Sequence, residues 1–154
     1  MNIQVSTVVN DSADVIFTYL TETEKLKLWQ TFLVESESLS NGTIGVGSKF
    51  RNVMSHPGFD TSGIVTLELI GEVLVFEPNK QLKIRGESNI ANLIIDYRLY
   101  QVDDKTTIQQ TADFELQGFL LRSISNLMNG FLVDQFQADL TKLKLLVEAQ
   151  QKSK

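Results

Sequence analysis

The C-terminal end of the chain carries the longest stretch with a single hydrophobic periodicity, over residues 119–150. Apolar residues recur there at helical spacing and line one face of an amphipathic helix: Leu120, Ile124, Leu127, Phe131, Leu140, Leu143 and Val147. A second apolar row widens this face in the first half only, with Phe119, Met128, Leu132 and Phe136. Such a helix is stable only against an apolar surface, which the earlier part of the chain must provide.

Before this segment, apolar and polar residues alternate as they do in half-buried strands. The expected strands cover residues 3–9, 32–39, 48–55, 62–76, 82–87, 92–102 and 106–116. Short turns, such as 40–42 and 103–105, join successive strands, and short connections require antiparallel pairing. Apolar residues occupy both faces of 62–76, so the pattern leaves the inward face of that strand unassigned, and we expect a bulge near Gly71.

Two short helices are expected between the first two strands. Their apolar residues are Val15, Ile16, Tyr19 and Leu20 in the first and Leu26 and Trp29 in the second. The order of elements predicts an α+β fold in which a curved, seven-stranded antiparallel sheet wraps around the long helix and the short helices close one side. We expect one domain over 1–150, a disordered tail at 151–154, and an internal cavity on the concave side of the sheet.

The composition argues against several classes of binding partner and site. The formal charge of -5 and the absence of a basic cluster argue against nucleic acid and anionic membrane surfaces. The chain has no cysteine, which excludes a disulfide, a thiolate metal ligand and a thiol nucleophile. It shows no signal-peptide pattern and no apolar run long enough to span a membrane, so we expect a cytoplasmic protein.

Few residues are candidates for chemistry. His56 is the only histidine and has no evident partner, so we expect neither catalysis by it nor a metal site, and no cofactor is indicated. Asn52, Tyr97 and Gln110 are each the polar member of an otherwise apolar inward row. Two interpretations remain open for these three: they orient a ligand in an apolar pocket, or they are core residues satisfied by the sheet or by water. Alternation places Arg51, Arg85 and Arg98 on the outward face.

The chain resembles the START/Bet v 1-like (SRPBCC) superfamily, and within it the bacterial polyketide cyclase/dehydrase-like branch. The resemblance covers nearly the whole chain and rests on the order and spacing of short segments at 11–17, 24–29, 45–50, 77–82, 97–99, 105–108 and 140–144. It implies a helix-grip fold with a hydrophobic cavity between the sheet and the long helix. Members bind lipids, sterols, polyketides or other apolar molecules, and some act as cyclases or dehydratases. The family's motifs are structural and carry over no catalytic residue.

Three functions follow as hypotheses. The first is a non-catalytic binder of a lipid, isoprenoid or polyketide-like molecule, acting as a monomer or homodimer. Its expected ligand-binding residues are Phe50, Asn52, Met54, Ile84, Ile95, Tyr97, Gln110, Phe114, Leu127 and Phe131. The second is a cyclase or dehydratase that uses Tyr97 as a proton donor, supported by Gln110. The third is a module that binds a protein partner and has a filled core.

The long helix also carries an expected weak point. Glycine is unfavourable inside a helix by about 1 kcal/mol, so a kink or a break is expected at Asn129 and Gly130. A hinge there would let the first part of the helix act as a gate for ligand entry.

Overall fold

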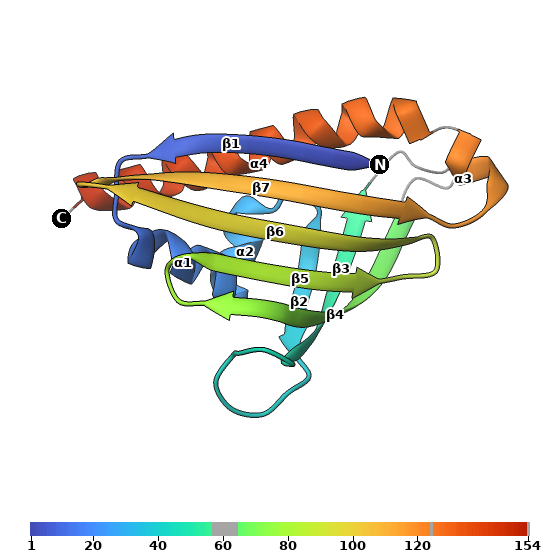
Figure 1. The fold of residues 1–154 in the computed structure, drawn as a ribbon, viewed down its shortest axis with the longest axis horizontal. Helices are drawn as coiled ribbons and strands as arrows, with labels where there is room; N and C mark the ends of the chain where they lie inside the picture. Colours follow the sequence, from blue (N-terminus) through green and yellow to red (C-terminus); the bar gives the residue numbers. More distant parts are fainter. Residues whose placement is uncertain (57–64, 124, 154) are drawn as a thin grey trace.

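The computed structural model describes residues 1–56, 65–123 and 125–153. Within this part of the chain, seven antiparallel strands form one curved sheet in the order β1-β7-β6-β5-β4-β3-β2. The sheet bends around the C-terminal helix, as expected for a helix-grip fold (Figure 1). The strands are β1 (Asn2–Val9), β2 (Leu33–Ser38), β3 (Lys49–His56), β4 (Val65–Glu77), β5 (Gln81–Glu87), β6 (Ala91–Val102) and β7 (Lys105–Leu116).

Tight turns set the antiparallel order of the central strands. Asn79, between β4 and β5, and Asp103, between β6 and β7, both have a positive φ, of 65° and 56°. Asn and Asp adopt this left-handed conformation more readily than other residues with a side chain. They therefore allow tight turns between antiparallel strands at these two positions. The β6–β7 pairing that results runs without a register shift from Ala91↔Leu116 to Val102↔Lys105.

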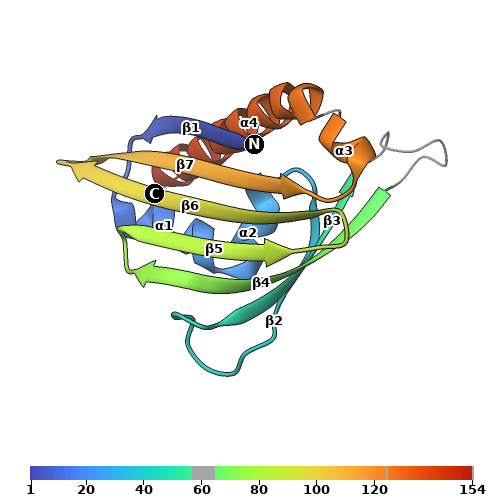
Figure 2. The ribbon, with the colours of Figure 1, turned by 45° about the vertical axis from the view of Figure 1, so that its right-hand side comes forward.

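Two short helices close one end of the concave face. They are α1 (Ala13–Thr21) and α2 (Thr23–Trp29), and they lie between β1 and β2 in the chain. Figure 2 shows both of them within the curve of the sheet, where α1 contacts β6 and α2 contacts β2. Trp29 is buried, and its Nε1 donates a hydrogen bond to the Tyr19 carbonyl oxygen at 2.9 Å, which ties the end of α2 to α1.

The C-terminal segment forms two helices where one was expected. They are α3 (Phe119–Ser123) and α4 (Ser125–Lys152), and residue 124 lies outside the described residues. The helix continues through Gly130, so the break expected as one possibility at Asn129 and Gly130 is not found. The cost of one glycine, about 1 kcal/mol, is small compared with the packing of the rest of α4. Leu140, Leu143 and Val147 anchor that packing, because each is at most 1% exposed.

The register of β4 explains its mixed apolar pattern. Leu67, Leu69 and Val73 face the concave side, and the pairing with β5 then shifts between Val73 and Val75. The extra residue changes the alternation, so Phe76 turns inward and packs edge-on against Phe17, with ring centroids 5.5 Å apart. The bulge was expected near Gly71, and it lies a few residues further along β4, between Val73 and Val75.

Candidate functional site

A cavity of about 610 Å³ lies between the concave face of the sheet, α2 and the first half of α4. Its wall is mostly apolar and takes residues from six of the seven strands, β2 to β7. A cavity of this size is contrary to the filled core that the partner-binding hypothesis requires. Ser38, Gly42 and Lys49 belong to the wall and are also exposed, so the cavity reaches the surface beside the β2–β3 connection.

Eight of the ten expected ligand-binding residues lie on this wall. They are Phe50, Asn52 and Met54 from β3, Ile84 from β5, Ile95 and Tyr97 from β6, and Gln110 and Phe114 from β7. The alternation of each strand places these residues on the concave face, because side chains two apart in a strand share a face.

Leu127 and Phe131 are not on the wall. Leu127 is 78% exposed, and Phe131 is 39% exposed and stacks on Phe32, with ring centroids 6.1 Å apart. Phe131 precedes Leu140 by nine residues, which is about two and a half helical turns and places it on the opposite side of α4. The residues of α4 that do line the cavity are Met128, Leu132, Phe136 and Asp139.

Tyr97 and Gln110 form the centre of the polar part of the wall. They are direct partners across β6 and β7, and they are 4% and 3% exposed. Gln110 Oε1 is the one fully buried side-chain oxygen or nitrogen in the described residues that has no hydrogen-bond partner. The Tyr97 hydroxyl forms no hydrogen bond with the described part of the chain either. The wall therefore offers polar groups that no side chain around them satisfies.

The side chain of Asn52 differs from those of Tyr97 and Gln110 because it has a hydrogen-bond partner. Its Oδ1 accepts a hydrogen bond from the Ser36 hydroxyl at 2.7 Å, across the β2–β3 pair. One end of this amide is thus satisfied within the sheet. Of the three polar candidates, Asn52 agrees best with the interpretation as a satisfied structural residue.

Asp139 is a functional candidate that the sequence pattern did not single out. It is 7% exposed, and its Oδ1 accepts hydrogen bonds from the Thr31 hydroxyl at 2.6 Å and from Gln135 Nε2 at 2.9 Å. Burial raises the pKa of this carboxyl, while the hydrogen bonds from Thr31 and Gln135 oppose the rise. The spacing could have indicated it, because Asp139 follows Phe136 by three residues and precedes Leu143 by four, on one helical face.

Tyr97 connects the sheet to this carboxyl. Burial raises the pKa of the Tyr97 phenol, and the nearby charge of Asp139 raises it further. The Trp29 ring packs edge-on against Tyr97, with centroids 6.3 Å apart, and so fixes the orientation of the phenol. We call Tyr97, Gln110 and Asp139 the polar cluster.

Two glycines keep the middle of the sheet open. Gly71 and Gly86 are direct partners on β4 and β5, and both are buried. A Cβ at Gly71 would overlap the ring of Phe50, and a Cβ at Gly86 would overlap Leu69. The missing side chain at Gly71 therefore lets Phe50 lie flat against the strands, where a larger residue would push its ring into the cavity.

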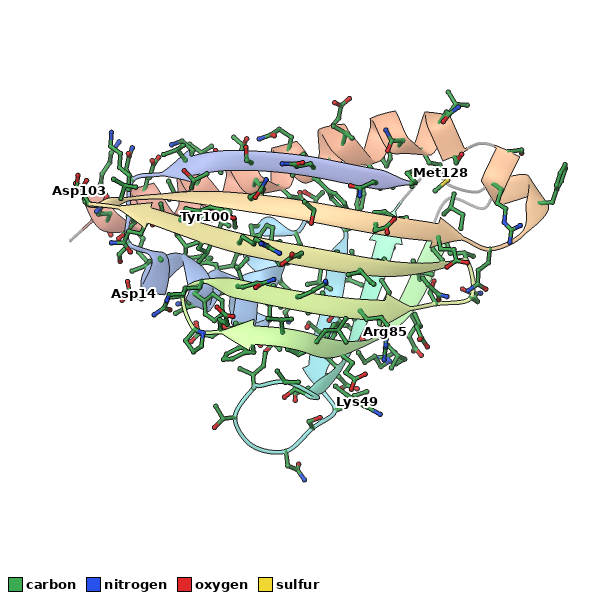
Figure 3. The ribbon with its side chains drawn as sticks, in the orientation of Figure 1. Asp14, Lys49, Arg85, Tyr100, Asp103 and Met128 are labelled. Carbon is green, nitrogen blue, oxygen red and sulfur yellow. The ribbon has the colours of Figure 1, made fainter. Side chains whose placement is uncertain are left out.

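Basic side chains are nearly absent from the described wall, where Lys49 is the one cationic residue. It lies beside the β2–β3 connection, whereas Met128 lies at the start of α4, and Figure 3 shows the two at opposite edges of the molecule. The three arginines of the strands point outward as expected and pair with carboxylates: Arg51 with Glu68, Arg85 with Glu72 and Arg98 with Asp96. The centre of the cavity thus has an acidic group and no basic one among the described residues.

The described residues offer neither a metal-binding cluster nor a helix that could span a membrane. The described residues contain no group of three or more His, Asp or Glu side chains placed to hold a metal ion. His56 is the last residue of β3 and pairs with Val65, and the 57–64 part of the expected loop lies outside the described residues. None of the helices in the described ranges is both long enough and apolar enough to cross a membrane.

Comparison with solved structures shows the same fold in several bacterial proteins. TTHA0849 from Thermus thermophilus is 12% identical, with a TM-score of 0.79 over 97% of this chain and 99% of that chain. NE0264 from Nitrosomonas europaea is 18% identical, with a TM-score of 0.72 over 100% and 97%. SA2116 from Staphylococcus aureus, described as a protein of unknown function, is 12% identical, with a TM-score of 0.73 over 99% and 96%.

Sequence comparison identifies the family. No curated protein matches this chain in sequence. The model of a family described as polyketide cyclase / dehydrase and lipid transport matches residues 1–148. With the helix-grip architecture, this match shows that the chain belongs to the polyketide cyclase/dehydrase and lipid transport family, within the START/Bet v 1-like superfamily.

Proposed function

We propose that the protein binds an apolar small molecule, of the lipid, isoprenoid or polyketide-like class, in the cavity between the sheet and α4. The observation that carries this proposal is the cavity of about 610 Å³ with its largely apolar wall. Its volume falls within the roughly 300–1,000 Å³ that is usual for small-molecule sites. A space of this size left empty would deprive the surrounding side chains of dispersion contacts, and an apolar ligand would restore them.

Burial of the ligand would drive binding. Each 100 Å² of apolar ligand surface that leaves water contributes about 2.5 kcal/mol before the costs of association are subtracted. Four strands of the curved sheet line the space with Phe50, Ile84, Ile95 and Phe114, and α4 covers it with Leu132 and Phe136. Entry is proposed beside the β2–β3 connection, where Ser38, Gly42 and Lys49 bring the wall to the surface.

Two measurements test this proposal. Native mass spectrometry of the purified protein should show a bound apolar species, or a one-to-one complex after addition of the neutral fluorophore N-phenyl-1-naphthylamine. The fluorophore should bind with a saturable increase in emission. A protein that carries no ligand and takes up none of the fluorophore would contradict the proposal.

A second function has one observation in its favour. Cyclases and dehydratases need a proton donor inside the cavity, and Asp139 is a carboxyl on the wall whose pKa is raised by burial. Tyr97 is less suited to that role than the sequence indicated, because its raised pKa makes it a weaker acid. If the protein is an enzyme, Asp139→Asn should remove turnover of a β-hydroxy carbonyl substrate while binding persists, and Tyr97→Phe should affect turnover less. Equal turnover in Asp139→Asn and the wild type would rule out this role.

A further inference from the structure

The cavity contains a recognition site for one kind of polar group. We propose that the polar cluster binds the hydroxyl of a neutral, otherwise apolar alcohol or phenol, whose hydrocarbon part fills the rest of the cavity. This inference rests on the proposed function and specifies the chemical class of its ligand. It is carried by the three members of the polar cluster, which are Tyr97, Gln110 and Asp139.

The first step is the state of the Gln110 side chain. It is 3% exposed, and Oε1 lacks a partner among the described residues. A buried amide without partners is unfavourable, and a leucine at this position would extend the apolar row of Ile108 and Ala112 without that cost. Because Oε1 also has almost no accessible surface, a partner that enters the cavity reaches it only once the amide side chain turns toward the ligand.

The second step is the chemistry of that partner. Gln110 Oε1 accepts and requires a donor, whereas the adjacent Tyr97 hydroxyl can donate. A hydroxyl does both, because it donates one hydrogen and accepts through its oxygen. A ketone or ester accepts only, and it would leave Oε1 unsatisfied. A hydroxyl also serves the opposite orientation of the amide, because it can accept from Nε2 as well as donate to Oε1, whereas a ketone or ester is disfavoured only in the orientation that presents Oε1.

The third step is charge. The pKa of Tyr97 is raised partly by the nearby charge of Asp139, and Asp139 Oδ2 forms no hydrogen bond with a described residue. A carboxylate placed here would meet the acidic Asp139 and no basic residue of the described wall, while the charge of Lys142 acts on Asp139 from outside the wall. Lys49, the cation of the described wall, is on β3, four strands from β7. At about 4.8 Å per strand this is roughly 19 Å along the sheet. A fatty acid held by Lys49 would put its tail against Gln110 and satisfy nothing there.

The test compares three probes with the same alkyl chain: 1-dodecanol, its methyl ether and dodecanoate. Each displaces N-phenyl-1-naphthylamine from the full-length protein at pH 8. The wild type should bind the alcohol about tenfold more tightly than the ether, and more tightly than the carboxylate, because the ether cannot donate to Gln110. Gln110→Leu should bring the alcohol-to-ether ratio close to one while the ether still binds.

Two further variants secure the comparison. Gln109→Leu is the matched control, because Gln109 precedes Gln110 on β7 and points to the outer face, and it should keep the wild-type ratio. Tyr97→Phe replaces Gln110→Leu if that variant does not fold, and it should lower the ratio in the same direction.

The possible results distinguish failure of the proposed hydroxyl site from failure of the proposed apolar binding. Equal binding of alcohol and ether by the wild type, with both displacing the fluorophore, would overturn the hydroxyl site and leave apolar binding intact. Tightest binding of dodecanoate, lost in Lys49→Met, would also overturn it, because the polar head would then lie at the entrance. Failure of the protein to bind the fluorophore at all would overturn the proposed function together with this inference.

Discussion

Single side chains on the cavity wall differ in how their polar groups are satisfied. Asn52 bonds to Ser36, and Asp139 is held by Thr31 and Gln135 through one oxygen, whereas Gln110 Oε1 has no hydrogen-bond partner among the described residues. Buried polar groups are normally satisfied, so the exceptions indicate where stability has been given up for another purpose. Two predictions at this scale measure that loss.

Gln110→Leu should stabilise the protein in the absence of ligand. The substitution removes a buried amide without partners, so the free energy of unfolding should rise by about 1–3 kcal/mol. Urea unfolding measures the change. Gln109→Leu on the outer face of β7 is the control and should change stability by less than about 0.5 kcal/mol. A loss of stability in Gln110→Leu would mean that the amide is satisfied in the folded protein.

Asp139→Asn should stabilise the protein at pH 7 but not in acid. Burial raises the carboxyl pKa above its ordinary value of 3.8, so in the window between the two values the folded state binds more protons than the unfolded state. The free energy of unfolding therefore falls as the pH rises through this window, and the loss is complete above the raised pKa. The asparagine variant has no such loss.

Unfolding of both proteins as a function of pH tests this directly. The amount by which the free energy of unfolding of Asp139→Asn exceeds that of the wild type should be largest at pH 7. It should shrink as the pH falls toward 3.8. Asp134→Asn, on the exposed side of α4, should differ little from the wild type at any pH. A stability difference that grows in acid would show that the pKa of Asp139 is not raised.

Sequence reasoning at the residue scale succeeded where a strand alternates cleanly. Period two placed Tyr97 and Gln110 inward and Arg98 outward, as the structure has them. Asp139 escaped notice because a charged residue within an amphipathic helix is ordinarily solvated. Its burial depends on Thr31, which is 108 residues away in the chain and supplies the hydrogen bonds that make burial tolerable. Patterns within one element do not contain such a partner.

Individual elements shape the cavity through backbone features. The paired glycines of β4 and β5 create room for Phe50, and the bulge after Val73 turns Phe76 toward α1. The helix α4 covers the space with one row of side chains and anchors itself with another. Sequence reasoning found both rows but took Leu127 and Phe131 as ligand-binding residues, and neither is on the described cavity wall, because the helical phase was not carried back from Leu140 to Phe131.

Gly71→Ala should reduce the cavity and weaken ligand binding. The new methyl group overlaps the Phe50 ring, and we expect that ring to move into the cavity that it lines. We expect the affinity for N-phenyl-1-naphthylamine to fall by about tenfold, equivalent to about 1.4 kcal/mol. The double variant Gly71→Ala/Phe50→Leu should recover most of the affinity, because leucine lacks the ring atoms that clash. Unchanged binding in Gly71→Ala would show that Phe50 can move elsewhere.

Gly130→Ala tests whether α4 bends during binding. A Cβ at Gly130 meets nothing within 4 Å, so alanine should raise the free energy of unfolding by about 0.5–1 kcal/mol through helix propensity alone. Rates of fluorophore binding and release should stay the same, because the helix is already continuous through this position. Slower binding with unchanged affinity would restore the hinge that the sequence suggested.

For the whole molecule, the fold could be predicted from the sequence, but the volume and lining of the cavity could not. Strand and helix patterns in sequence order, with the family resemblance, gave the helix-grip fold, because short connections leave few ways to arrange an antiparallel sheet. The volume and contents of the cavity depend on sheet curvature and on contacts such as Trp29 with Tyr97 and Thr31 with Asp139. Those arise only when distant segments come together.

The central claim is that a ligand occupies the space enclosed by the sheet and α4. Ile94 and Ile95 are neighbours on β6, and of the two only Ile95 lines the cavity, while Ile94 is 37% exposed. The direct measurement is calorimetric titration of N-phenyl-1-naphthylamine into Ile95→Trp and the matched variant Ile94→Trp. The account predicts at least a tenfold loss of affinity in Ile95→Trp, whose indole fills the cavity, and wild-type affinity in Ile94→Trp. Equal affinity in both variants would place the ligand outside the cavity and contradict the account.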